Sequence, residues 1–258
     1  MHVMTFSFLN RKTTIEKPPV LRFTSLRVDV HSHVLPGLDN GPLALESSVR
    51  MAQVLANAGI RKVIATPHIM KGYYENSVAR IQEVCRELQS ELRYRRIELQ
   101  LEAAAEYYAE PELLDRVQGG EPLLTFGRKG HQPYLLFETG ILDEPPQLEA
   151  LIRSLLQRHI RPVLAHPERY RYLQKNFNRT IELFRMGVFF QLDWASFHAR
   201  ENPEVRQLAE RLVDYRMVSF VGTNVHHESQ LAYLWESERQ PYFRLMTDIG
   251  LVNNELGT

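Results

Sequence analysis

The amino-acid sequence predicts an α/β fold with a parallel sheet, either open or closed into a barrel, in a single domain. Short apolar runs rich in β-branched residues alternate with longer stretches of helical periodicity, seven times along the chain. No break in composition divides this series into separate domains. The 258 residues, 44% of them hydrophobic, suit one large domain of this kind. Strands that alternate with helices form parallel sheets with helical crossovers.

The seven predicted strands are short and apolar. In chain order they cover residues 26–30, 62–66, 97–104, 134–138, 162–166, 188–193 and 218–222. Helices are predicted at 44–59, 76–92, 111–117, 145–159, 178–187 and 202–215. In the first helix, apolar residues recur three and four positions apart and Gly59 ends the pattern. The last predicted helix begins with Asn202 as its N-cap and Pro203 at the first helical position.

The overall composition argues against several classes of function. Lys and Arg together number 31, as do Asp and Glu, so no net charge favours binding to nucleic acid or to anionic membranes. No apolar run reaches the roughly 18 residues that a membrane span needs, so no stable membrane insertion is expected. The single cysteine, Cys85, allows no internal disulfide and fits a cytoplasmic protein. Residues 1–24 are predicted to form a flexible N-terminal tail and residues 25–258 the folded domain.

Ligand-type side chains follow six of the seven predicted strands. In chain order they are His31, His33, His68, Glu106, Glu138, His166, Asn224 and His226. The sixth strand offers Gln191 and Asp193 instead. The carboxyl ends of parallel strands lie on one face, where active sites are built, so these side chains are expected to meet. Five histidines and two glutamates without cysteine suit Mn, Fe, Zn or Mg.

Each of these residues alone is a weak signal, because a pair of nearby histidines or a glutamate at a strand end is common without a metal. The conjunction on one predicted face carries the interpretation. His159 and His198 fall outside the pattern and are expected to be ordinary surface residues. His227 follows the last ligand candidate and is a candidate for orienting it.

The motifs resemble a known family. "VDVHSHVLPGLDNG", "VIATPHI", "AAEYY", "LLFE", "PVLAHPERY" and "FVGTNVHH" resemble the PHP (polymerase and histidinol phosphatase) superfamily, and most closely its bacterial metal-dependent protein-tyrosine phosphatases encoded with capsule and exopolysaccharide genes. The resemblance covers about residues 26 to 235 in the right order. It implies a distorted (β/α)7 barrel, in agreement with the seven units, and two or three divalent metal ions per chain, with manganese favoured.

The resemblance also implies roles for individual residues. A first metal site would use His31, His33, Glu106 and Asn224; a second would share Glu106 and add Glu138 and His166; a third would use Asn40, His68 and His226. Arg169 would bind the substrate phosphate, and Arg169 and His68 are predicted as catalytic residues. Tyr73 and Lys71 are predicted to bind the substrate, and the neighbouring Tyr74, Tyr107 and Tyr108 are candidates for the same rim.

Two residues depart from the family pattern. Asn40 and Asn224 stand where the family has aspartates, so the expected ligand set loses two negative charges and should bind metal more weakly. Asp39 lies one residue from Asn40 and can partly replace it if the turn shifts. Restoring aspartate at positions 40 and 224 is expected to raise metal occupancy and rate.

The function implied is hydrolysis of phosphotyrosine on a tyrosine kinase of polysaccharide synthesis. Divalent metals would activate a water for attack on phosphorus, with Arg169 neutralising phosphate oxygens. One alternative is a small phosphate ester such as histidinol phosphate as the substrate. Another, of a different class, is an inactive homologue that binds phosphotyrosine peptides without turnover, for which Asn40 and Asn224 are the argument.

Overall fold

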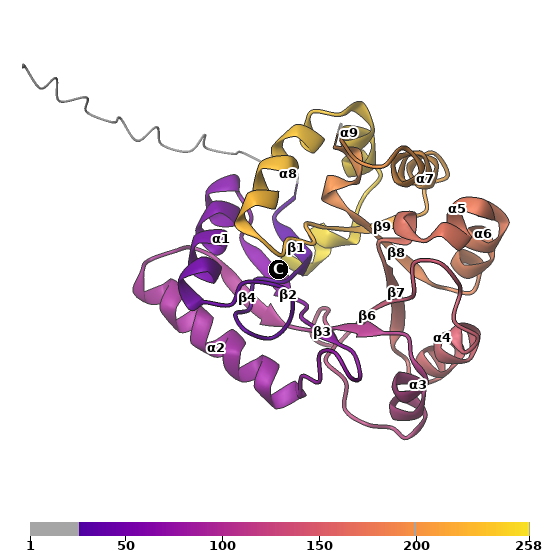
Figure 1. The fold of residues 1–258 in the computed structure, drawn as a ribbon, viewed down its shortest axis with the longest axis horizontal. Helices are drawn as coiled ribbons and strands as arrows, with labels where there is room; N and C mark the ends of the chain where they lie inside the picture. The colour runs from indigo at the N-terminus through magenta and orange to yellow at the C-terminus, as the bar shows by residue number, and fades with distance from the viewer. Residues whose placement is uncertain (1–25, 199, 258) are drawn as a thin grey trace, which may run out of the picture.

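The computed structural model describes residues 26–198 and 200–257, and they form a ring of strands surrounded by helices (Figure 1). The predicted tail, residues 1–24, lies outside the described residues. Every pair of named strands that shares a ladder is parallel, as the alternation of strands and helices predicts. None of the helices in the described ranges combines the length and the apolar character that a bilayer span requires.

All seven predicted strands are present, and two short strands that were not predicted, β3 and β5, follow the second and the third of them. The strands are β1 Val28–Ser32, β2 Lys62–Ala65, β3 His68–Ile69, β4 Gln100–Ala103, β5 Glu106–Tyr108, β6 Tyr134–Glu138, β7 Arg161–Ala165, β8 Phe189–Asp193 and β9 Val218–Gly222. Residues 66–67 separate β2 from β3, and residues 104–105 separate β4 from β5. The first strand begins two residues later than predicted and includes His31, which the sequence placed just after it.

The two breaks divide the ring into two sheets. One has the order β1-β2-β4 and the other β3-β5-β6-β7-β8-β9. The ring closes between β1 and the segment after β9, where Asn224 N donates to His31 O at 2.8 Å and His33 N donates to Val225 O at 3.0 Å. The result is a distorted barrel of seven strand-and-helix units, which confirms the predicted fold class.

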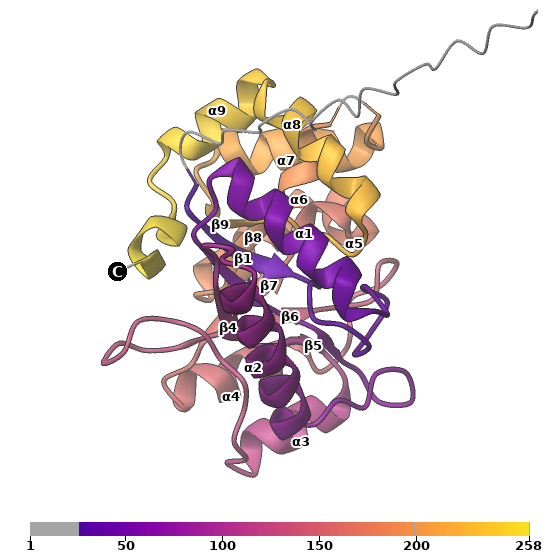
Figure 2. The ribbon, with the colours of Figure 1, turned by 90° about the vertical axis from the view of Figure 1, so that its left-hand side faces the viewer.

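The helices lie outside the ring. They are α1 Leu45–Ala58, α2 Val78–Tyr94, α3 Pro111–Gln118, α4 Leu148–Gln157, α5 Arg171–Lys175, α6 Phe177–Arg185, α7 Pro203–Asp214, α8 Leu231–Glu238 and α9 Pro241–Asp248. Gly59 ends α1 with φ +105°, and its N–H bonds the carbonyls of Leu55 and Ala56. The Asn202 side chain accepts from Glu204 N at 2.8 Å, so its predicted role as N-cap is confirmed. The sequence did not predict α5, α8 or α9; α8 and α9 lie beside α7 at one end of the molecule (Figure 2).

The strands are apolar because both of their faces are covered. A large core lies between the strands and the helices, and a smaller apolar cluster takes alternate residues of several strands. Tyr134 and Leu136 of β6 belong to the smaller cluster. Glu138 comes two residues further along and therefore extends from the same face of β6 as they do. The period of two along a strand thus places a carboxylate at the end of an apolar face.

Candidate metal centre

Buried Glu106 is the centre of a cluster of imidazoles and carboxylates at the carboxyl ends of the strands. Its Oε2 lies 3.1 Å from His31 Nε2 and 3.4 Å from His33 Nε2. Its Oε1 lies 3.1 Å from His166 Nε2. His68 Nδ1 lies 3.2 Å from both Glu106 Oε2 and Glu138 Oε1. Residues separated by up to 135 positions in the sequence therefore share one carboxylate.

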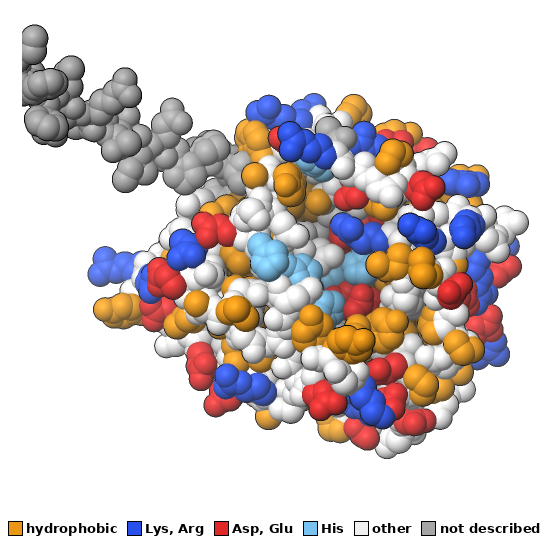
Figure 3. Space-filling view, in the orientation of Figure 1, with side chains coloured by type: hydrophobic (Ala, Val, Ile, Leu, Met, Phe, Trp, Pro, Cys, Tyr) orange, Lys and Arg blue, Asp and Glu red, His pale blue; other side chains and the backbone are white. Residues whose placement is uncertain are grey.

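Three groups within the cluster have the ligand atoms that a metal ion requires. They are His31, Glu106 and His166; His68, Glu106 and Glu138; and His33, His68 and His226. The ligand atoms of each group lie within 4.8 Å of one another. In the space-filling view, histidine and acidic side chains gather in a depression at the middle of this face (Figure 3).

Two glycines allow the backbone to approach the cluster closely. A Cβ at Gly222, the last residue of β9, would lie 2.3 Å from the Cβ of His31. A Cβ at Gly41 would lie 2.4 Å from the carbonyl oxygen of His33. Real Cβ atoms do not come so near other atoms, so both positions require glycine. The register of β1 against β2 also shifts between Asp29 and Ser32, where His31 lies, and such irregularities re-aim side chains.

Two of the cluster residues have left-handed backbone conformations. His166 has φ +34° and Asn224 has φ +48°. Histidine and asparagine tolerate this region better than most residues, yet it still costs free energy that the surrounding structure must supply. His166 directly follows β7 and Asn224 lies two residues after the end of β9, so in both places this conformation turns the chain after a strand.

The charges of the cluster shift its pKa values in opposite directions. Burial lowers the pKa of His31, but the nearby Glu106 carboxylate outweighs this and raises it to about 9. Burial would raise the pKa of Glu106, but His31 and the other imidazoles hold it well below its usual range. Burial, and then the neighbouring His33, lower the pKa of His226 to about 3. Glu106 and the imidazoles around it thus favour each other's charged forms, whereas the neutral form of His226, in which it can act as a ligand, is favoured.

The cluster fits a divalent metal. His31 Nε2 and His33 Nε2 lie only 3.2 Å apart and converge on the same carboxylate oxygen. Asn224 Oδ1 is buried without a hydrogen-bond partner. Buried polar atoms without partners cost free energy, and several lone pairs aimed into one small space are what a cation would satisfy. Imidazole and carboxylate donors suit Mn, Fe, Zn or Mg, as the composition of the set predicts.

Asn40 does not occupy the place that the resemblance implied. Its side chain is exposed, whereas the Asp39 carboxylate is buried and lies 2.7 Å from His33 Nδ1. Asp39 Oδ2 also accepts from His68 N at 3.0 Å. The ligand set predicted with Asn40 is therefore corrected to one with Asp39 beside the third group. The physical reason is the tight turn that Gly41 permits, in which Gly41 N donates to Asp39 Oδ1 and directs that carboxylate inward.

The predicted substrate-binding residues differ in their exposure and in their contacts. Arg169 is about one third exposed, and its Nε donates to Asp193 Oδ2 at 2.6 Å. Tyr73 is 78% exposed, and the exposed Lys71 pairs with Glu112. Tyr107 is not a rim residue, because its side chain is buried and its hydroxyl accepts from Leu124 N.

Several residues near the cluster were not assigned a role from sequence. Gln191 Oε1 lies 2.7 Å from His31 Nδ1 and so orients that imidazole. Tyr74, by contrast, was a candidate for the rim, and its ring stacks on His68, with centroids 5.3 Å apart. Buried Glu168 accepts from Asp193 N at 2.8 Å and from Ser196 Oγ at 2.6 Å. Gln191 and Asp193 are two residues apart on one strand, and this spacing was the signal in the sequence that both side chains lie on the same face.

The remaining histidines lie outside the cluster in different ways. His198 is buried and its Nε2 lies 2.6 Å from Glu236 Oε2, so its expected place on the surface is wrong. His159 is exposed, as expected. His227 is exposed and caps the short 3-10 turn Glu228–Gln230 through its side chain. It therefore supports the chain after His226 and contacts no cluster carboxylate in the described part of the structure.

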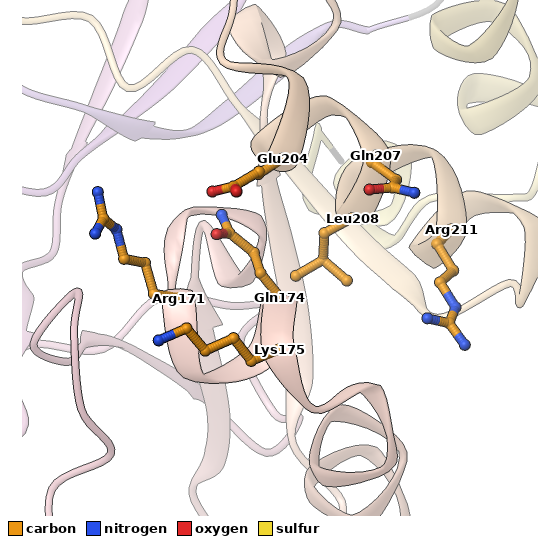
Figure 4. A pocket seen from close by; sticks show the side chains of 7 residues that line it. All are labelled: Arg171, Gln174, Lys175, Glu204, Gln207, Leu208 and Arg211. Carbon is orange, nitrogen blue, oxygen red and sulfur yellow. The ribbon is translucent and has the colours of Figure 1, made fainter.

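A second hollow of about 350 Å³ lies between α5 and α7 (Figure 4). Arg171 and Lys175 extend into it from α5, and Glu204 faces them from α7 (Figure 4). Arg211 lies at the opposite end of the hollow from Arg171 (Figure 4). Arg171 follows Arg169 by two residues in the sequence.

Comparison with known proteins agrees with the geometry. The family model for capsular polysaccharide synthesis, CpsB/CapC, matches residues 27–239. The chain belongs to the CpsB/CapC family. Tyrosine-protein phosphatase YwqE of Bacillus subtilis is 28% identical over 218 residues, which are 82% of this chain and 84% of YwqE. Tyrosine-protein phosphatase CpsB of Streptococcus pneumoniae is 25% identical over 228 residues, 86% of this chain and 88% of CpsB.

Solved structures extend the likeness to the whole CpsB/CapC fold. Crystal structures of YwqE from Bacillus subtilis and CpsB from Streptococcus pneumoniae, described as unique metal-dependent tyrosine phosphatases, match with a TM-score of 0.77 and 25% identity. The match covers 89% of this chain and 93% of the other. A phosphotriesterase homology protein from Escherichia coli matches with a TM-score of 0.51 and 13% identity, which shows a shared fold alone. The resemblance read from the motifs is therefore confirmed.

Proposed function

We propose that this chain is a metal-dependent phosphotyrosine-protein phosphatase of capsule or exopolysaccharide synthesis. It would hydrolyse the phosphoric monoester of tyrosine. The observation that carries the proposal is the sharing of buried Glu106 among His31, His33, His68 and His166 in a chain of the CpsB/CapC family. Phosphatases named as tyrosine-specific and metal-dependent stand among its relatives.

The three ligand groups would hold two or three divalent ions, with Mn favoured and Fe, Zn or Mg as alternatives. Glu106 is common to two groups and His68 also to two, which supports closely spaced ions. Such ions supply Lewis acidity that activates water near neutral pH. The buried site excludes other water, and Gln191 and Asp39 fix the imidazoles of His31 and His33 by bonds of 2.7 Å each. Fixed imidazoles keep their ligand atoms in place through each turnover.

Arg169 is the proposed phosphate-binding residue. Its Nε is occupied by Asp193, and its partly exposed guanidinium retains N–H groups for phosphate oxygens. Glu201 lies 3.7 Å from the Arg169 amino group, at the edge of ion-pair distance, and can yield to a phosphate. His68 is the proposed second catalytic residue, because it belongs to two ligand groups and lies between Glu138 and the Tyr74 ring. A tyrosine leaving group, with a pKa near 10, needs less protonation than an alkyl alcohol.

The substrate proposed is a phosphotyrosine segment of a bacterial tyrosine kinase of polysaccharide synthesis, in the cytoplasm. Exposed Tyr73 would offer an aromatic ring to the peptide. Lys71 already pairs with Glu112, so it contributes less to recognition than its charge alone suggests. Arg171 and Lys175 have no carboxylate within ion-pair distance in the described residues. They are better placed to attract an acidic peptide.

An assay with three arms tests the proposal. The full chain is freed of metal with a chelator, reloaded with Mn²⁺, and offered a phosphotyrosine peptide, histidinol phosphate or phosphotyrosine alone. Metal-dependent release of phosphate from the peptide is the expected result. Release from histidinol phosphate alone would support the small-ester alternative. Binding of the peptide without release would support the inactive homologue.

A further inference from the structure

Asp193, the last residue of β8, holds two functional side chains at once. It is fully buried, and its Oδ2 accepts from Arg169 Nε at 2.6 Å and from Asn224 Nδ2 at 3.0 Å. Its backbone N–H donates to Glu168 Oε1 at 2.8 Å, which fixes the end of the strand. One carboxylate therefore sets the positions of the phosphate-binding arginine and of an asparagine beside the metal ligands.

The orientation of the Asn224 amide follows from this contact. An ionised carboxylate can only accept hydrogen bonds, so Asn224 must present its NH₂ group to Asp193. Its Oδ1 then points away from Asp193, and it is buried with no hydrogen-bond partner. The backbone of Asn224 is tied to the same site, because its N–H donates to His31 O at 2.8 Å and its carbonyl lies 3.0 Å from His226 Nδ1. The unpaired acceptor thus belongs to a residue whose backbone is bonded to two ligand histidines.

We propose that Asp193 and Asn224 together replace one metal-binding carboxylate. Asn224 supplies the neutral ligand oxygen, and Asp193 supplies the negative charge one hydrogen bond away. This inference rests on the proposed function, because it takes the cluster to bind divalent cations. Asp193 is a positioning residue, and its negative charge replaces the one that an aspartate at position 224 would carry.

Moving the charge between the two positions tests the inference. Metal-free full chain is titrated with Mn²⁺ by isothermal calorimetry for the wild type, Asp193→Asn, Asn224→Asp and the double exchange Asp193→Asn/Asn224→Asp. Asp193→Asn should weaken the affected site about 10–100-fold, the range for loss of a group that orients a metal ligand. The double exchange should return the affinity to within about threefold of the wild type, because it keeps both the charge and the hydrogen bond.

The single variant Asn224→Asp adds a readout that does not depend on activity or on the folding of Asp193→Asn. It places two carboxylates about 3.0 Å apart, and like charges at this distance repel. The melting temperature of the metal-free variant should therefore fall below that of the wild type, and Mn²⁺ should raise it by more than it raises the wild type. An equal Mn²⁺ shift in the two proteins would overturn the inference.

Asp29→Asn is the matched control. Asp29 is similarly buried, but its carboxylate bonds Thr223 and the His31 backbone N–H, and within the described residues it makes no hydrogen bond to a ligand side chain. This variant should lose stability while keeping Mn²⁺ affinity within about threefold of the wild type. Wild-type affinity in Asp193→Asn, or a double exchange as weak as Asp193→Asn, would refute the inference and leave the phosphatase proposal standing. A wild type that binds no divalent metal would instead refute the proposed function.

Discussion

Glu106→Gln is the substitution that the cluster should tolerate least. Glutamine keeps the shape of the side chain but removes the charge that lies 3.1–3.4 Å from four imidazole nitrogens. The remaining amide can coordinate metal through one oxygen only, and its NH₂ group would face a cation or an imidazole. Glu106 belongs to two of the three ligand groups, so both should weaken together.

The size of the effect can be worked out from ligand-linked stability. At a free Mn²⁺ concentration 100 times the dissociation constant, a bound ion stabilises the folded chain by about 2.7 kcal/mol. For a domain of this size, that raises the melting temperature by roughly 5–11 °C. If Glu106→Gln weakens binding about 100-fold, the same Mn²⁺ concentration contributes only about 0.4 kcal/mol, or roughly 1–2 °C.

Thermal unfolding with chelator and with Mn²⁺ measures this shift for each protein against itself, so a change in metal-free stability cancels. Glu112→Gln is the control, because Glu112 is an exposed acid that pairs with Lys71 and lies six residues from Glu106. The control should show the full wild-type shift. A wild-type shift in Glu106→Gln would refute the idea that this carboxylate joins the metal ligands.

Three further predictions follow from the same geometry. Arg169→Lys keeps the positive charge but loses the planar guanidinium, so kcat/KM on a phosphotyrosine peptide should fall about 10²-fold in steady-state assays. Unchanged kinetics would exclude Arg169 as the phosphate-binding residue. Asp39→Asn should weaken Mn²⁺ binding about tenfold in calorimetry, because Asp39 contacts His33. Asn40→Asp should change the Mn²⁺ affinity less than threefold, because Asn40 is exposed. A larger effect at position 40 than at position 39 would restore Asn40 as the ligand. Burial raises the pKa of Cys85 to about 11, so alkylation of the native chain at pH 8 should be at least about 100-fold slower than that of a free thiol. Cys85→Ala should remain an active phosphatase. Rapid labelling or an inactive variant would contradict these expectations.

The fold class followed from the sequence because the strand and helix periods differ so clearly. Seven apolar runs between amphipathic stretches predicted seven units, and the structure has them. The short strands β3 and β5, which follow the second and third runs after breaks of two residues, were not predicted. Broken strands keep their apolar character, and pairing with different neighbours on either side of the break depends on distant strands. Helices α5, α8 and α9 were missed because they are short or follow the last predicted strand.

The position of the cluster could also be predicted, since the carboxyl ends of parallel strands share one face. His31, Glu106 and His166 meet there as expected. The sequence could not decide whether Asp39 or Asn40 points toward the cluster. The two residues are adjacent, and a shift of the turn by one residue decides which side chain points inward. The importance of Gly41 for that turn is visible only when its distance to the His33 carbonyl is known.

The charge deficit inferred from Asn40 and Asn224 was an incomplete count. It considered only the residues in the matching motif positions. Two further carboxylates lie beside the same cluster. Asp39 contacts His33, and Asp193 accepts a hydrogen bond from Asn224. A carboxylate that is near in space but distant in the sequence is not found when motifs are compared position by position.

Anomalous diffraction from crystals soaked in Mn²⁺ tests the central claim most directly. The claim is that side chains from six separate strand ends jointly bind a compact group of divalent cations. Two or three anomalous peaks should appear among His31, His68, Glu106, Glu138 and His166, with at least one in contact with Glu106. The absence of a peak at this cluster, when Mn²⁺ is bound elsewhere or nowhere, would contradict it.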